Sequence, residues 1–161
     1  MHIKRTFCTI IAAIMLLGTT ACHKKYIENT QIRDTEDNRK ILELLETYRS
    51  AMEEKDADKL VSLCSVHYYE DMTTSEKHDD FTLKELKDKV VPEIFAHTDE
   101  LYLSITVDAL ELKKNRGYVD FRYDYRAHLV FPAGGKWLND TEFNRFELVK
   151  EDGRWLVLSG L

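Results

Sequence analysis

The chain has 161 residues, enough for one domain, and its 43% hydrophobic and 32% charged content is typical of an ordinary folded protein. With only 6 Gly and 2 Pro, the composition argues against long linkers and low-complexity architectures. The formal net charge of −6, without a basic stripe, argues against nucleic acid as a partner, because that affinity depends on neutralising phosphates.

Residues 1–21 have the three parts of an export signal. Lys4 and Arg5 form a short positive start, and an uncharged apolar stretch follows over residues 7–17. Small residues occupy positions 18–21. The apolar stretch is too short to span a bilayer, which needs about 20 residues. Residues 1–21 are therefore predicted to be a signal peptide, whose removal leaves the remaining chain two charges more negative.

The sequence LGTTAC, which ends at Cys22, resembles the lipobox of bacterial lipoproteins. It departs from the usual pattern at Thr19, where the lipobox normally has leucine. The resemblance implies that Cys22 becomes the N-terminus and carries acyl chains such as palmitate, which anchor the protein in the membrane of the cell envelope. By similarity with proteobacterial sorting, His23 implies the outer membrane, facing the periplasm, in a Gram-negative host. The alternative is plain secretion after cleavage at Ala21.

One cysteine remains for the folded domain, because Cys8 leaves with the signal and Cys22 is the expected lipid attachment site. No internal disulfide is therefore expected. Cys64 lies beside Leu60 and Leu63 on an expected helix and is predicted to be a buried small hydrophobe. The sequence shows neither a nearby base nor a helix N-terminus that would make it a nucleophile.

A polar segment without apolar periodicity, residues 23–35, separates the signal from the first helix. It is predicted to be a coil that reaches roughly 20 Å on average. The expected organisation is therefore a signal peptide at 1–21, a lipidated tether at 22–36 and one domain at 37–161.

Three helices are predicted in the first half of the domain. Apolar residues at spacings of three and four indicate the first over residues 38–54. Asp56 is the expected N-cap of the second, which ends near Ser65. The third begins after Thr82, which has the capping-box spacing to Glu85. Pro92 lacks a backbone donor and is expected to kink or restart this third helix.

From residue 101 onward the apolar period changes to two, which predicts antiparallel strands. Within residues 101–112 the apolar phase moves from odd to even positions, which predicts a β-bulge near Asp108 or Ala109. Three turns are expected to separate the strands: residues 115–117, residues 132–136 centred on Gly134-Gly135, and Asp152-Gly153.

The element order is helix, helix, short strand, helix and then an antiparallel meander, which indicates an α+β fold. Residues 37–161 resemble the NTF2-like cone fold in two segments, the helical opening YRSAMEEKDADKLVSLCS and the strand–turn–strand ending FELVKEDGRWLVLSG. The resemblance implies three N-terminal helices packed on a curved antiparallel sheet of about four main strands, around an apolar pocket. This fold hosts many activities, so it implies no single function.

The favoured interpretation is a ligand-binding or protein-interaction module of unknown specificity. The alternative is a small-molecule isomerase or dehydratase of the ketosteroid-isomerase or SnoaL-like type. In that family a helix tyrosine precedes an inter-helix aspartate by eight residues, as Tyr48 precedes Asp56, and the catalytic carboxylate falls near Asp71. The carboxylate would move a proton beside a carbonyl while the tyrosine stabilises the oxyanion. A second oxyanion acid has no clear counterpart here, and Tyr48 and Asp71 also suit a core position and a solvated loop.

Alternation along residues 118–131 sorts one strand into two faces. One set points toward the helices and supplies the candidate pocket-lining residues: Phe121, Tyr123 and Tyr125, together with Tyr48. The other set is Arg122, Asp124, Arg126 and His128. We expect the second set to form a solvated face with cross-strand pairs to Glu142, Arg145 or Glu147. A homodimer through this face, an apolar small ligand and an envelope protein remain open as partners.

Four of the six histidines fall in the expected domain, scattered at positions 67, 78, 97 and 128. No pair has the helical i, i+4 spacing or the alternating strand spacing that would direct two imidazoles at one ion. The sequence therefore predicts neither a metal site nor another cofactor.

Overall fold

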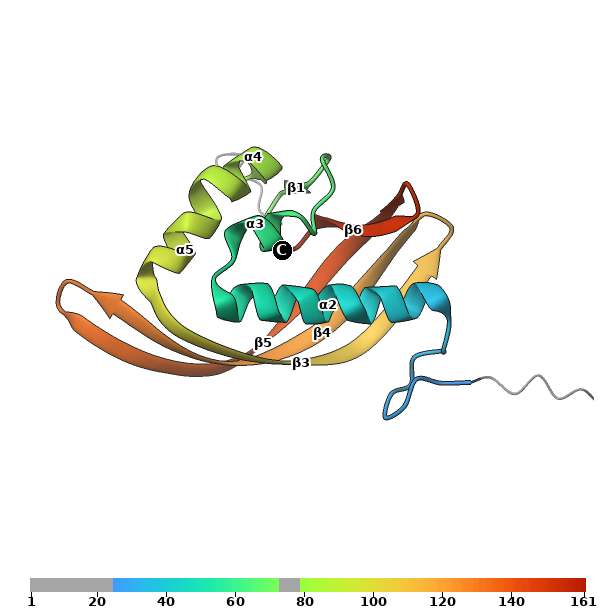
Figure 1. The fold of residues 1–161 in the computed structure, drawn as a ribbon, viewed down its shortest axis with the longest axis horizontal. Helices are drawn as coiled ribbons and strands as arrows, with labels where there is room; N and C mark the ends of the chain where they lie inside the picture. The colour runs from blue at the N-terminus through green and yellow to red at the C-terminus, as the bar shows by residue number, and fades with distance from the viewer. Residues whose placement is uncertain (1–24, 73–78) are drawn as a thin grey trace, which may run out of the picture.

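The computed structural model describes residues 25–72 and 79–161. The predicted signal peptide, Cys22 and His78 lie outside these residues. The domain has two layers, with helices on the concave face of a strongly curved sheet (Figure 1). In the described part of the chain, no helix combines the length and the apolar character needed to cross a bilayer.

The first helix, α2 (Glu36–Glu54), crosses the concave face of the sheet (Figure 1). Its N-cap is Thr35, whose hydroxyl accepts a hydrogen bond from the backbone N–H of Asn38. Lys55 ends it in the left-handed conformation, with φ 55°. The second helix, α3 (Ala57–Val61), has the predicted cap, since Asp56 accepts from the N–H of Lys59. It is shorter than predicted, because the chain turns at residues 62–63 to run beside the last strand.

The third helical segment has three parts: α4 (Leu83–Glu85), the π-helical turn η1 (Leu86–Val90) and α5 (Val91–His97). The Thr82–Glu85 capping box is confirmed, with both of its hydrogen bonds present. The expected restart at Pro92 takes the form of the π-helical turn directly before it, which is one of the usual ways to bend a helix. Just before this segment, β1 (Tyr69–Glu70) pairs with β2 (Phe81–Thr82).

Four antiparallel strands form the sheet in the order β3-β4-β5-β6. Their bounds are β3 (Thr98–Lys113), β4 (Arg116–Phe131), β5 (Gly134–Glu151) and β6 (Arg154–Ser159). The predicted bulge is confirmed by a register shift between Val107 and Ala109. A second shift, between Thr98 and Glu100, has no counterpart in the sequence predictions.

The three turns occur where strands were expected to reverse, but the first begins one residue earlier than predicted and the second is shorter than predicted. Lys113 pairs with Arg116 and Phe131 pairs with Gly134, so the loops are residues 114–115 and 132–133. Two-residue loops close tightly enough that the predicted turn glycine, Gly134, becomes the first residue of a strand. The Asp152-Gly153 turn is confirmed, with φ 47° and 79° at its two residues.

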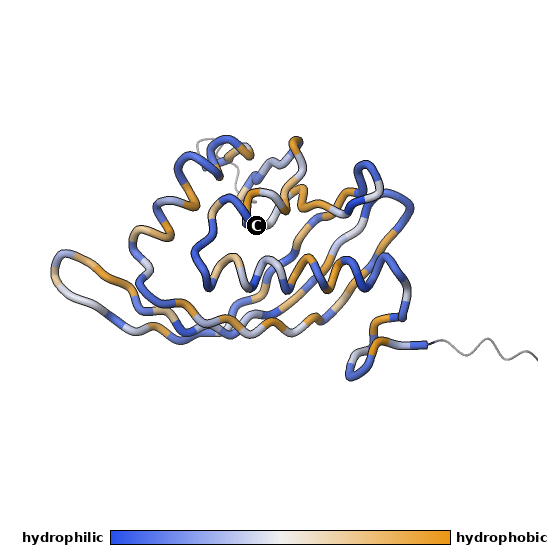
Figure 2. Tube along the Cα trace, viewed as in Figure 1, coloured by the Kyte–Doolittle hydropathy of each residue, from blue (hydrophilic) through white to orange (hydrophobic). Residues whose placement is uncertain are grey.

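The core lies between α2 and the sheet. The largest fully buried side chains are Phe121, Phe146, Ile41, Leu60, Leu86 and Leu148. In Figure 2, polar and apolar residues alternate along α2 and the long strands, as expected of elements that bury one face. Cys64 is buried as predicted, and burial raises the pKa of its thiol to about 12.

Residues 25–35 form a closed loop where the sequence predicted a coil. Tyr26 bridges to Arg33, the N–H of Ile27 donates to the carbonyl of Ile32 at 2.9 Å, and the N–H of Asp34 donates to the carbonyl of Lys25 at 2.8 Å. We call residues 25–34 the N-terminal loop. Hydrogen bonds between backbone groups leave no apolar periodicity, which is why the sequence pattern did not reveal this loop.

The carboxylate of Asp34 fastens the loop to itself and to α2. It lies 3.1 Å from Lys25 Nζ and 2.6 Å from Arg39 Nε. Hydrogen bonds from Arg39 and Lys25 lower the pKa of Asp34 to about 2. In an unfolded chain an aspartate titrates near pH ~3.9. The contribution of Asp34 to stability is therefore present above about pH 4 and is lost as the pH falls from about 4 to about 2.

Asp34→Asn is expected to loosen the N-terminal loop at neutral pH. The amide of Ile27, which is bonded across the loop, should exchange with solvent several-fold faster, as measured by NMR hydrogen exchange. Glu36→Gln is the matched control, because Glu36 pairs with Lys40 within α2 and not with the loop. In the wild type, the same loss of protection should occur between about pH 4 and pH 2, after correction for the intrinsic rate. Unchanged protection in Asp34→Asn would contradict the fastening role.

Candidate functional site

The concave face carries a cluster of three tyrosines around one carboxylate. The register pairs Tyr123 with Glu142, which places both side chains on the same face of the sheet. Tyr123 donates to Glu142 at 2.9 Å and Tyr125 donates to it at 3.4 Å. Burial, with Glu142 nearby, raises the pKa of both tyrosines, and the same two causes raise the pKa of Tyr48 to about 12. All three phenols therefore remain protonated donors at neutral pH.

The predicted pocket-lining residues form one row of packed rings. Tyr48 is 6% exposed, and its ring meets those of Phe121 and Phe146 edge-on, with centroids 6.2 and 5.1 Å away. Tyr123 lies 6.2 Å from Phe121, and Tyr125 lies 6.0 Å from Tyr123. The row therefore fills the space between α2 and the sheet near Tyr48 and becomes partly exposed at Tyr123 and Tyr125.

Asp71, the candidate catalytic carboxylate, lines a hollow that meets this row at Phe121. It is exposed and follows β1 directly, and the hollow, of about 930 Å³, is also lined by His67, Asn144 and Gly160. Tyr48 does not line that hollow. A base and an oxyanion donor must both reach one substrate, and these two side chains do not line the same hollow.

A larger groove of about 1300 Å³ lies between the N-terminal loop, the start of α2 and the strand β3. Its apolar lining includes Ile32, Leu42, Ile105, Val107 and Leu110. Two ion pairs stand in its walls: Lys150 lies 2.6 Å from Asp37, and Arg122 lies 3.0 Å from Asp108. The groove exceeds the roughly 300–1,000 Å³ of typical small-molecule pockets, and it is open to solvent.

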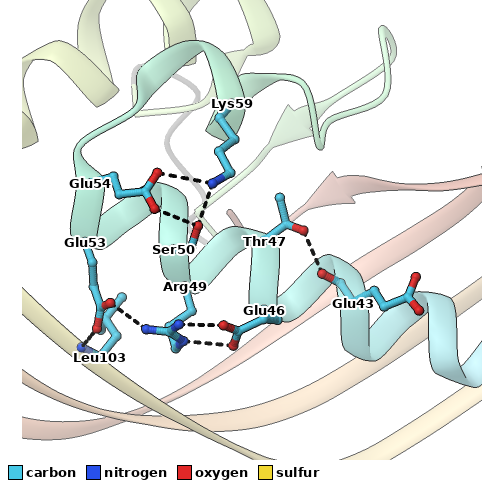
Figure 3. A network of polar contacts seen from close by, with 9 residues as sticks. All are labelled: Glu43, Glu46, Thr47, Arg49, Ser50, Glu53, Glu54, Lys59 and Leu103. Atoms are coloured by element: carbon cyan, nitrogen blue, oxygen red, sulfur yellow. Dashed lines mark hydrogen bonds and ion pairs between the residues drawn. The ribbon is translucent and has the colours of Figure 1, made fainter.

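One wall of the groove is the free edge of the sheet, because β3 is the outermost strand. The N–H of Leu103 donates to Glu53 Oε1 at 2.8 Å, so it points away from β4 (Figure 3). Alternate residues of an antiparallel strand point the same way, and the pairing with β4 is regular from Glu100 to Val107. The N–H and C=O groups of Ile105 and Val107 therefore also point outward, into the groove.

Side chains near the end of α2 cover the other part of this edge. Glu53 caps Leu103 and is itself held by Arg49, whose guanidinium lies 2.5 Å from it (Figure 3). Lys55 Nζ donates to the carbonyls of Thr98 and Asp99 at 3.1 and 2.8 Å. For Ile105 and Val107, the described residues supply no such cap. The uncovered stretch of the edge is thus the part that faces the groove.

The convex face of the sheet is a set of cross-strand contacts. Arg122 pairs with Asp108, the Thr141 hydroxyl donates to Asp124, and Arg126 lies over the Trp137 ring at 4.2 Å. The face is paired as predicted, but with other partners: Arg145, one of the expected ones, pairs with Asp120 instead. Glu142, which was expected among the partners, lies instead on the concave face, because the register sets it opposite Tyr123.

The described residues bring one set of possible metal ligands together. Asp99, Glu100 and His128 each offer an atom within 4.8 Å of the others. Of the remaining described histidines, His67 lines the hollow with Asp71 and His97 stacks on Phe131 at 5.9 Å. Paired histidines would have marked a metal site in the sequence, whereas here two carboxylates and one histidine converge across two strands.

Solved structures similar to this chain include a member of the NTF2-like family. The Kfla4162 protein from Kribbella flavida superposes with a TM-score of 0.64 at 16% identity, over 77% of this chain and 87% of that one. A member of the NTF2-like family from Streptomyces avermitilis gives 0.63 at 13% identity, over 77% and 93%. A ketosteroid isomerase-like protein from Erwinia carotovora atroseptica gives 0.61 at 14% identity, over 78% and 94%.

These similarities confirm the predicted fold, a curved antiparallel sheet with helices on its concave face. No family sequence model and no curated protein sequence matches the chain. At these identities the likeness concerns the fold alone, and the function must be argued from the chain's own surface.

Proposed function

We propose that this chain is an exported, lipid-anchored protein whose NTF2-like domain binds an extended polypeptide segment of an envelope partner in the groove along β3. The observation that carries the proposal is the uncovered edge at Ile105 and Val107, whose outward backbone groups face the groove. An added strand would pair with these groups, while the apolar groove wall would receive alternate side chains of the partner.

The size and filling of the available spaces favour a polypeptide over a small molecule. The interior next to Tyr48 is occupied by the rings of Phe121 and Phe146. The groove is open and of mixed polarity, as suits a chain that brings its own backbone hydrogen bonds. The isomerase-like alternative would need Tyr48 and Asp71 at one substrate, and their positions give it less support.

The expected lipid anchor favours a partner that lies close to the membrane. If Cys22 is acylated, only residues 22–24 separate it from the closed N-terminal loop, and the step from residue 22 to residue 25 spans at most about 10 Å when fully extended. Residues 29–33 of that loop line the groove. The groove would therefore lie at the anchored end of the domain, within reach of segments that emerge from the bilayer.

Ile105→Pro is expected to abolish partner binding. Proline removes the outward N–H of Ile105 and leaves the hydrogen bonds between β3 and β4 in place. An outward-facing position on an edge strand is where a sheet tolerates proline. A photo-crosslinking residue at Gln31, on the opposite wall of the groove, should yield one membrane-associated adduct in the native host. We expect Ile105→Pro to reduce this adduct at least tenfold and Ile105→Val, which keeps the N–H, to preserve it.

Two results would overturn this proposal. An adduct that survives Ile105→Pro would show that the edge is not the binding element. An adduct consisting of two copies of this chain would assign the groove to self-association. A crosslinker at Phe143, which is 76% exposed on the convex face, gives the background level for comparison.

A further inference from the structure

A second β-bulge gathers three ligand-type side chains at the other end of β3. Its register shift lies between Thr98 and Glu100, and Glu100 pairs with His128 of β4. In a bulge, two consecutive residues of one strand stand opposite a single residue of the next. Asp99 is the additional residue, and its carboxylate Oδ2 lies 3.1 Å from His128 Nδ1. The bulge thus directs two successive carboxylates at one imidazole.

We propose that Asp99, Glu100 and His128 form a binding site for a divalent transition-metal ion of the Zn²⁺ class. The ion would take the place of the proton between Asp99 and His128. Two ligands of a tetrahedral Zn²⁺ stand about 3.3 Å apart when the bonds are about 2.0–2.1 Å long, close to the observed 3.1 Å. Glu100, whose ligand atom lies within 4.8 Å of the other two, would close the set by rotation of its side chain.

Neighbouring contacts already fix the orientation of the ligands. The Tyr102 hydroxyl donates to Glu100 Oε2 at 2.8 Å and leaves the other carboxylate oxygen for the ion. The His128 ring stacks on Trp137, with centroids 4.9 Å apart. Lys55 donates to the carbonyl of Asp99 and holds the bulge. Such supporting contacts around a ligand set typically change metal affinity 10–100-fold.

Gly135 gives the His128 ring the room that this orientation needs. A Cβ atom at position 135 would lie 2.4 Å from Nε2 of His128, which is closer than any real contact. The ring therefore rests against a backbone without a side chain, and its Nδ1 faces Asp99. Any larger residue at this position would push the imidazole out of place.

The composition of the set selects the kind of metal. An imidazole with two carboxylates suits Zn²⁺ and its neighbours in the first transition row, whereas Ca²⁺ and Mg²⁺ prefer oxygen ligands alone. Three protein ligands leave a position for water or a further ligand. The positive charges of Lys55 and Arg126 lie nearby and lower the affinity of the site for a cation.

Calorimetric titration of the complete mature chain with ZnCl₂ tests this site. The protein should carry no affinity tag and should be freed of metal beforehand. We expect one ion per chain, an affinity at least tenfold lower in His128→Gln and in Asp99→Asn, and no change in His67→Gln, the matched histidine control. CaCl₂ and MgCl₂ should give no binding at the same concentrations.

Gly135→Ala separates the proposed geometry from a simple attraction of cations to acidic side chains. It removes no ligand, yet it should lower Zn²⁺ affinity roughly tenfold by displacing the His128 ring. Co²⁺ bound to the wild type should show the intense visible absorption of a low-coordinate site, and Gly135→Ala should weaken that band. Wild-type affinity in His128→Gln, an equal loss in His67→Gln, or Ca²⁺ binding as tight as Zn²⁺ would overturn the proposal.

Discussion

Phe146→Ala is expected to lower the free energy of unfolding by about 3–5 kcal/mol. Phe146 is 0% exposed, and its ring lies 5.1 Å from that of Tyr48 and 4.8 Å from that of Phe121. Truncation would leave a cavity between α2 and the sheet, at the centre of the core. Urea unfolding of the complete mature chain, followed by circular dichroism, measures the change.

Phe143→Ala is the matched control for this prediction, because it is the same substitution on the same strand. Phe143 lies three residues earlier, on the convex face, and is 76% exposed. Its loss should change the unfolding free energy by no more than about 0.5 kcal/mol. Equal effects from the two substitutions would contradict the assignment of the two faces of β5.

The Phe146 prediction also bears on the choice between a small-molecule pocket and a groove. Tyr48, Phe121 and Phe146 together occupy the interior of the cone at this level. A protein that keeps a pocket for a substrate gives up packing there and the stability that comes with it. Here the rings make edge-on contacts, which stabilise the core beyond the burial of area alone. With this part of the interior filled by rings, the groove along the edge of β3 is the better place for a ligand.

Features decided by residues close together in sequence were predicted correctly. The Asp56 cap, the Thr82–Glu85 capping box and the Asp152-Gly153 turn each depend on a few neighbouring positions. The bulge at Val107–Ala109 was also predictable, because apolar residues precede and follow it and their phase changes across it.

The second bulge left no such signal in the sequence. It lies at Asp99, directly after α5, so no earlier part of the strand sets an apolar phase with which to compare. The face of Glu142 was equally hidden, since β5 has no clean alternation of polar and apolar residues around it. Both the metal-ligand set and the tyrosine–glutamate cluster depend on register between strands, and register is a long-range property.

The groove depends on contacts that join distant parts of the chain. Lys150 and Asp37, which form one of its walls, lie 113 positions apart, and the N-terminal loop is closed by backbone hydrogen bonds. The pattern of residues 23–35 could therefore indicate polarity but not the closed loop. The closed loop shortens the expected tether and would bring the groove toward the membrane.

Cys22→Ser is expected to move the protein almost completely from the membrane fraction to the soluble fraction. Each buried CH₂ of an acyl chain contributes about 0.8 kcal/mol, so two or three chains anchor stably where one chain gives only reversible binding. Serine cannot carry the thioether-linked lipid and therefore removes the whole anchor at once. Fractionation of host cells, with mass spectrometry of the mature N-terminus, measures both location and acylation.

Cys8→Ser is the matched control, because the same substitution falls within the segment that is predicted to leave with the signal. It should leave the protein in the membrane fraction. Retention of Cys22→Ser in the membrane, with the signal still cleaved, would contradict lipid anchoring and point to another attachment. The Gln31 adduct separates lipid anchoring from partner binding. If the released Cys22→Ser protein still forms the adduct, it binds its partner without the anchor. If release abolishes the adduct while the Cys22→Ser protein remains folded, the anchor and the short segment at residues 22–24 hold the groove within reach of the partner.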